Sequence, residues 1–122
     1  MTDLTIILPL PPEALHPNGR TRHYSYRAAL IRKARGDAKL VASIATADRK
    51  PLIRAWIDST WYMPRRRDED GLIGWLKPYI DGLADAGVVV NDSGVTLTTP
   101  VQVTGKTANG KREVVLTVRN DE

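Results

Sequence analysis

Two aspartates two positions apart, Asp68 and Asp70, are the residues of this sequence best suited to chemistry. On an extended backbone their carboxylates would project from one face, roughly 6–7 Å apart along the strand, and could share a divalent cation. Arg65, Arg66 and Arg67 directly precede them and form an anion-binding patch. A nuclease needs such a layout, because the metal neutralises the scissile phosphate while the arginines hold the flanking backbone. The alternative is a solvated turn with a surface ion pair.

Two further residues could complete such a site. Asp92 follows a short apolar run, residues 88–90, and Lys77 lies between the two acidic segments. Three carboxylates and a lysine can form a Mg²⁺-dependent phosphodiesterase site, with the lysine as a point charge on the phosphate or as a proton donor. Asp92 could equally be a turn residue, because Asn-Asp-Ser-Gly is a strong turn sequence. The expected cofactor is Mg²⁺, with Mn²⁺ as a substitute.

Residues 63–95 resemble the RusA family of Holliday-junction resolvases. The family pattern is a basic run, Asp-x-Asp-Asn-Leu, a lysine, Asp-Gly-Leu-x-Asp-Ala-Gly-Val and an acidic turn. In this chain these elements are residues 65–72, Lys77, residues 81–88 and residues 91–92. The ends match more loosely: residues 4–12 look like the family's opening strand and residues 95–118 like its closing hairpin.

The resemblance implies a homodimeric endonuclease that resolves four-way DNA junctions by paired symmetric nicks in recombination and repair. Carried over by position, it implies metal binding by three aspartates and catalysis by these together with a lysine: Asp68, Asp70, Asp92 and Lys77. The chain departs from the pattern at Gly71, where the family usually has asparagine, and it has Pro78 directly after the lysine. Both features favour the alternative, a non-catalytic junction-binding module with a degraded active site.

Composition restricts the other possibilities. The 122 residues are enough for one domain with its own core, and no apolar run approaches the length of a membrane span. The start of the chain does not read as a secretion signal, so we expect a cytoplasmic protein. The absence of cysteine excludes thiolate metal sites. No phosphate-gripping glycine loop is present, so we expect no nucleotide cofactor and rank hydrolysis of small phosphate esters last.

The net charge of +4 is weak evidence for DNA binding, but the distribution of basic residues is more informative. Acidic residues gather between Asp68 and Asp92, and basic residues crowd the first third of the chain. Residues 13–24 are expected to form a long basic loop, which is either a solvated connection or a functional one. The arginines expected to position DNA phosphates are Arg20, Arg22, Arg65, Arg66 and Arg67.

The apolar patterns predict the elements in the first half of the chain. Residues 4–8 are a short apolar run with β-branched residues at its centre; prolines follow it, and it is expected to form a strand. Helical spacing predicts a helix over residues 25–47, whose basic face is either solvated or in contact with DNA. Residues 52–63 alternate as a second strand and would deliver Asp68 and Asp70 just past its end. The residues expected to face a core there are Ile53, Ala55, Ile57, Ser59, Trp61 and Met63.

A second helix is expected within residues 72–86, beginning near Trp75 so that Pro78 falls in its first turn, and ending at Gly87. Asp81 would then be a structural partner of Lys77 rather than a metal ligand. A short strand over residues 88–90, a strand over 95–103, a turn at Asn109 and Gly110 and a partner strand over 114–118 complete the chain. The predicted fold is α+β, a single domain over residues 1–122 with a mixed sheet, two helices packed against it and a C-terminal β-hairpin.

Overall fold

The computed structural model describes residues 3–16 and 24–121. Five strands of these residues form one sheet: β1 (Leu4–Pro9), β2 (Ala55–Met63), β3 (Val95–Leu97), β4 (Val101–Thr104) and β5 (Glu113–Asn120). Their order is β1-β5-β2-β3, and β4 also pairs with β2. Pairing with β5 is antiparallel for both β1 and β2, whereas β3 and β4 run parallel to β2. The sheet is therefore mixed, as expected.

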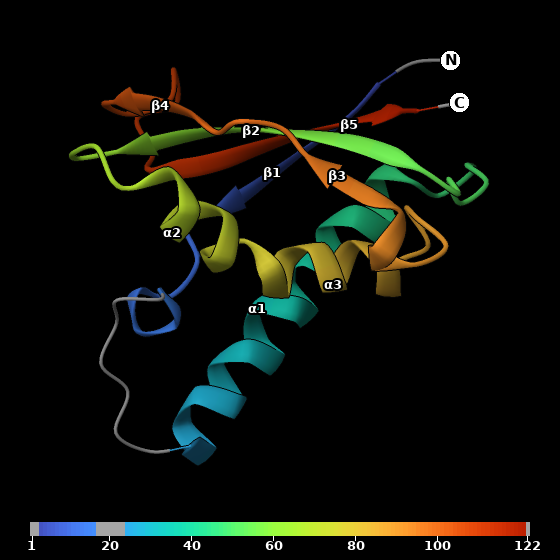
Figure 1. Cartoon of the computed structure of the whole chain (residues 1–122), viewed down its shortest axis with the longest axis horizontal. Coiled ribbons are helices and arrows are strands. Elements are labelled where there is room, and N and C mark those ends of the chain that lie inside the picture. Colours follow the sequence, from blue (N-terminus) through green and yellow to red (C-terminus); the bar gives the residue numbers. More distant parts are fainter. Residues whose placement is uncertain (1–2, 17–23, 122) are drawn as a thin grey trace.

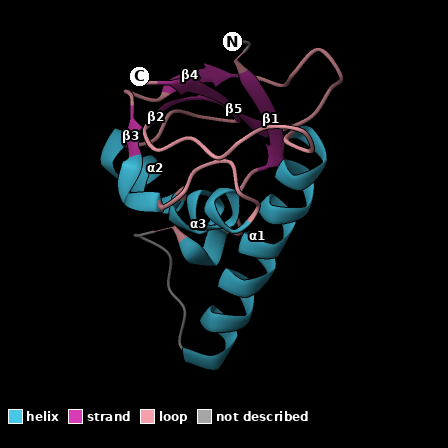
Figure 2. Ribbon diagram, turned by 90° about the vertical axis from the view of Figure 1, so that its right-hand side faces the viewer, coloured by secondary structure: helices cyan, strands magenta, loops and turns pink. Residues whose placement is uncertain are grey.

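The helices lie on one face of the sheet, as both Figure 1 and Figure 2 show. They are α1 (Tyr24–Ala45), α2 (Glu69–Trp75) and α3 (Lys77–Asp85), and two 3-10 turns, η1 (Glu13–Leu15) and η2 (Asp92–Gly94), complete the elements of the described residues. The predicted α+β class with a single core is confirmed. Within residues 3–16 and 24–121, no helix is both long and apolar enough to cross a bilayer.

Strand β2 is the centre of the core. Its odd-numbered residues, from Ala55 to Met63, are buried against the helices, and the even-numbered residues face the open side of the sheet. The expected alternation is thus confirmed from Ala55 onward. It was wrong at Ile53, which is 64% exposed because β2 begins only at Ala55. Before that point Leu52 makes only an isolated bridge to Val89, so residues 88–90 do not form a full strand.

Helices α1 and α3 cross at very short range. The buried face of α1 carries alanines, Ala34, Ala38 and Ala42, which leave room for a neighbouring backbone. A Cβ added at Gly82 of α3 would lie 2.4 Å from the carbonyl oxygen of Arg35. Position 82 therefore requires glycine, and the crossing fixes α3 beneath the sheet.

The second helical segment is divided into α2 and α3, which meet at Leu76. Pro78 lies in the first turn of α3, as expected, where its missing N–H costs little. Gly87 has φ of 82° and the Val88 N–H donates to the Leu83 carbonyl at 3.0 Å, which completes the expected glycine stop. The α2 helix was missed, because its start depends on a side-chain cap supplied by Asp68.

The C-terminal strands differ from the expected hairpin in two respects. The predicted turn is present, since Gly110 has φ of 75° and the Thr107 N–H donates to the Lys111 carbonyl at 2.8 Å. The strand expected over residues 95–103 is broken between Leu97 and Val101. The strands on either side of the turn, β4 and β5, flank β2 on opposite sides instead of pairing with each other. Strand β2 is thereby covered along both of its edges.

Candidate active site

Asp68 and Asp70 lie at the start of α2, just past the end of β2. Asp68 is the N-cap residue, and its Oδ2 accepts the Gly71 N–H at 3.4 Å, while Asp70 lies in the first turn. The expectation of two carboxylates on one face of an extended strand is therefore wrong, because the cap turns the chain into a helix at residue 69. Both carboxylates remain exposed at the molecular surface.

The backbone that leads into Asp68 is held by a side chain from β4. The Arg67 N–H donates to Gln102 Oε1 at 2.7 Å, and Gln102 Nε2 donates to the Arg67 carbonyl at 2.9 Å. Both backbone groups of Arg67 are thus satisfied by one amide, which holds this part of the backbone against β4. The sequence pattern did not reveal this role for Gln102, because the two residues are 35 positions apart.

The chain after β1 holds the same segment from the other side. Arg67 Nη2 lies 2.9 Å from Glu13 Oε2, and its guanidinium carbon is 4.9 Å from the ring centroid of Trp75. The Trp75 indole N–H donates to the Pro12 carbonyl at 2.8 Å. Figure 1 shows the turn after β1, in blue, close to α2. Arg67, expected to bind DNA, is therefore engaged in holding the segment, whereas Arg65 and Arg66 are exposed.

His16 lies against the first turn of α2. The residue is 5% exposed, and its ring packs edge-on against Trp75 with centroids 5.2 Å apart. A Cβ added at Gly71 would lie 3.1 Å from His16 Nε2. Burial lowers the pKa of His16, and the positive charge of Arg67 lowers it further. The sequence marked this histidine only as part of a basic loop, because the contact to α2 is a tertiary one.

Lys77 is the centre of a second group. Its Nζ lies 2.9 Å from Asp81 Oδ1 and 2.6 Å from Asp92 Oδ2, so the expected pairing with Asp81 is confirmed. The hydrogen bonds that Lys77 donates, first to Asp92 and then to Asp81, raise the pKa of Lys77, and Lys77 in turn lowers the pKa of Asp92. Asp92 also opens the turn η2, which Asn91 caps by accepting the Ser93 N–H at 3.0 Å. The ammonium is therefore held in its charged form between two carboxylates.

The structure brings the candidate residues into two groups. Asp68 and Asp70 share the start of α2, and Asp92 joins Lys77 and Asp81. Within the described residues, no three acidic or histidine side chains are gathered so that they could hold a metal ion. Carboxylate oxygens are nevertheless the ligands that Mg²⁺ prefers, and protein sites often supply one or two of them, with water and substrate phosphate completing the shell. Asp68 and Asp70 fit that arrangement, and a preformed three-aspartate site is not present among the described residues.

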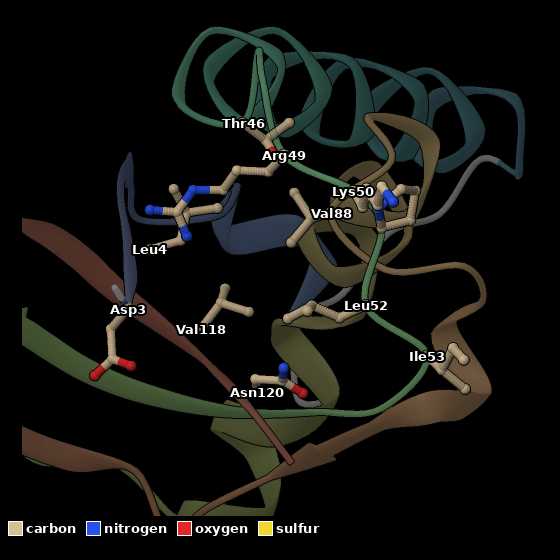
Figure 3. Close-up of a pocket in the computed structure, with 11 residues that line it drawn as sticks. Asp3, Leu4, Thr46, Arg49, Lys50, Leu52, Ile53, Val88, Val118 and Asn120 are labelled. Carbon is tan, nitrogen blue, oxygen red and sulfur yellow. The ribbon is translucent and has the colours of Figure 1, made fainter. Parts of the chain in front are cut away.

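The candidate residues lie on an open surface. A cavity of about 810 Å³ lies between the end of α1 and the sheet, lined by Thr46, Leu52 and Val118 among others (Figure 3). A second hollow of about 380 Å³ lies beside Asn91. Neither is lined by Asp68, Asp70, Lys77 or Asp92. Two of the expected DNA-binding residues, Arg20 and Arg22, lie outside the described residues.

Comparison with known proteins gives no activity for the chain. No model of a protein family matches it. The chain is similar to a protein of Xylella fastidiosa (strain Temecula1 / ATCC 700964) that is described as an uncharacterized protein, with 35% identity over 89 residues. This match spans 67% of the chain and 56% of that relative's length.

Proposed function

We propose that the protein is a Mg²⁺-dependent endonuclease that resolves four-way DNA junctions, as the resemblance to the RusA family implies. The observation that carries the proposal is the segment formed by residues 65–70. Its backbone is fixed by Gln102, and it presents the exposed carboxylates of Asp68 and Asp70 directly after three arginines. A fixed acidic pair beside exposed cations suits a phosphodiester that approaches from solvent.

Each residue of the proposed site has a role that its surroundings support. Asp68 and Asp70 would hold Mg²⁺ or Mn²⁺, with Asp92 as a third ligand that must first leave Lys77. When bound, the metal supplies an activated water and neutralises charge on the phosphate. Lys77 would act on the phosphate, either as a point charge or as a proton donor to the leaving oxygen. Arg65 and Arg66, with Arg20 and Arg22, would position the flanking phosphates.

The surface character of the site bears on the choice of substrate. Asp68, Asp70 and Lys77 are exposed and line neither of the two hollows described above, which favours a polymer over a small phosphate ester. Two like strands of a junction are cut symmetrically by two sites related by a two-fold axis, so we propose a homodimer. We place this activity in the cytoplasm.

The rival is a junction-binding module without catalysis, and one substitution pair separates the two. Asp70→Asn should abolish nicking of a synthetic four-way junction in Mg²⁺, because a ligand oxygen is removed, while gel-shift affinity should equal or exceed that of wild type. Glu69→Gln, which removes the neighbouring exposed carboxylate of the same turn, is the matched control and should nick normally.

Three other outcomes would decide against parts of the proposal. Nicking by Asp70→Asn at the wild-type rate would remove Asp70 from the site. Junction binding without any nicking by the wild-type protein, in Mg²⁺ or Mn²⁺, would establish the rival. Absence of both binding and nicking would contradict a junction-directed function altogether.

A further inference from the structure

The first turn of α2 has no side chain at position 71, and a ring from another part of the chain fills that space. A Cβ built on Gly71 would meet His16 Nε2 at 3.1 Å and His16 Cε1 at 3.2 Å. Contacts this short force a neighbour to move. Gly36, a glycine in α1, is different: a Cβ there would meet nothing within 4 Å. The need for glycine at position 71 therefore comes from His16 and not from the backbone, since the φ of Gly71 is not positive.

We propose that His16 is a positioning residue for the endonuclease site: its imidazole takes the place of a side chain at position 71 and holds the turn that carries Asp68 and Asp70. The part of this inference that concerns catalysis rests on the proposed function. The part that concerns packing does not, and it can be tested alone.

A continuous set of contacts ties the ring to the core. His16 packs edge-on against Trp75, and Trp75 stacks on the fully buried Trp61 of β2 with centroids 5.6 Å apart and an interplanar angle of 11°. The indole N–H of Trp75 is bound to the carbonyl of Pro12, four residues before His16. Residues 71 and 75 are four positions apart on one face of α2, and the ring lies against both of them. Because the ring is buried in this packing, it can resist displacement by a side chain at position 71, which a solvated side chain could not.

The packing is tested by whether the change in Tm caused by Gly71→Ala reverses its sign when His16 is removed. Gly36→Ala should raise the Tm by roughly 3–6 °C, because alanine is the better helix former. Gly71→Ala gains the same propensity but must displace His16, so in the wild-type background it should lower the Tm. In a His16→Ala background the same Gly71→Ala substitution should raise the Tm, as Gly36→Ala does. Equal effects of Gly71→Ala in both backgrounds would overturn the proposal.

His16→Ala leaves a cavity beside Trp75 and could prevent folding. His16→Val is the second background, because it keeps apolar volume against Trp75 but is too short to reach position 71. Reversal of the Gly71→Ala effect in every background that folds supports the proposal. If Gly71→Ala still lowers the Tm in the His16→Val protein, His16 does not control position 71 and the proposal is wrong.

The positioning role has its own measurement. His16→Val should raise the Mg²⁺ concentration needed for half-maximal nicking several-fold while leaving junction affinity in Ca²⁺ unchanged. His16→Gln, whose amide nitrogen can occupy the place of Nε2, should restore most of the wild-type requirement. An unchanged Mg²⁺ requirement in a His16→Val protein that nicks would show that the ring only stabilises the fold. If the wild-type protein never nicks, the proposed function fails, and the Tm experiment alone still decides whether His16 holds position 71.

Discussion

The two groups of candidate residues are held in different ways. The segment that carries Asp68 and Asp70 is fixed by neutral hydrogen bonds to its backbone from Gln102 and by buried aromatic packing through Trp75. Lys77 and Asp92, in contrast, are held by ion pairs whose side chains are 59% and 41% exposed. Buried packing is insensitive to salt, whereas exposed ion pairs are weak and screened.

This difference suggests that the two groups have different roles. The segment that must keep carboxylates in place is held mainly by contacts that salt does not screen, with one ion pair, Arg67–Glu13, beside them. An ammonium that must turn toward a phosphate is held by contacts that a phosphate can replace, because the phosphate offers the same charge-assisted bonds as Asp81 and Asp92. Substitutions in the two groups should therefore differ in their effect on stability and in their response to salt.

The largest effect is expected at Trp75, the residue that joins the first group to the core. Trp75→Ala removes a side chain that is 2% exposed, together with its contacts to Trp61, His16 and Arg67. The free energy of unfolding should fall by about 3–5 kcal/mol, as for other large buried aromatics. Lys77→Ala should lower the free energy of unfolding by less than about 1 kcal/mol. Urea denaturation measures the free energy of unfolding of both variants. Similar losses of stability in the two would contradict the difference between the two groups.

The same contrast explains which parts of the structure the sequence could predict. The alternation along β2, the pairing of Lys77 with Asp81 and the stop at Gly87 depend on neighbours within a few residues, and all three are confirmed. The cap that starts α2 was also local, but its aspartate was interpreted as part of an extended pair. Whether Asp68 caps a helix or continues an extended segment depends on tertiary packing, and the spacing of apolar residues in the sequence carries no information about that packing.

The contacts that position the first group could not be predicted. Gln102 and Glu13 reach Arg67 across 35 and 54 positions of sequence, and neither lies in a pattern that marks such a role. His16 was noted only as a loop residue, since nothing near it in the sequence indicates the contact to Gly71. The sequence therefore identified the residue types suited to the chemistry, but not the tertiary contacts that hold the segment carrying Asp68 and Asp70.

An intermediate effect is expected from two neighbouring arginines. Arg67 contacts Glu13 and Trp75, whereas Arg66 is exposed. Arg66→Ala should leave the Tm unchanged and reduce the slope of log affinity against log salt by about one for each phosphate that the arginine neutralises. Arg67→Ala should lower the Tm and change the slope less. Salt titration of junction binding, together with thermal melts, separates the two roles. The same Tm and the same salt slope in both variants would show that Arg67 does not help to hold the segment carrying Asp68 and Asp70.

The smallest effect is expected at Asp92, measured in EDTA so that no divalent metal contributes. Lys77 lowers the pKa of Asp92 below its ordinary value of 3.8. Because the folded-state pKa is the lower one, the ion pair stabilises the fold fully above about pH 4, and this contribution is lost as the pH falls through the folded-state pKa. Asp92→Asn should therefore melt slightly below wild type at pH 6, and the two melting curves should converge in acid. High salt at pH 6 should also shrink the difference. A difference that persists in both conditions would mean that Asp92 supports the turn η2 through its shape and hydrogen bonds rather than through the charge on Lys77.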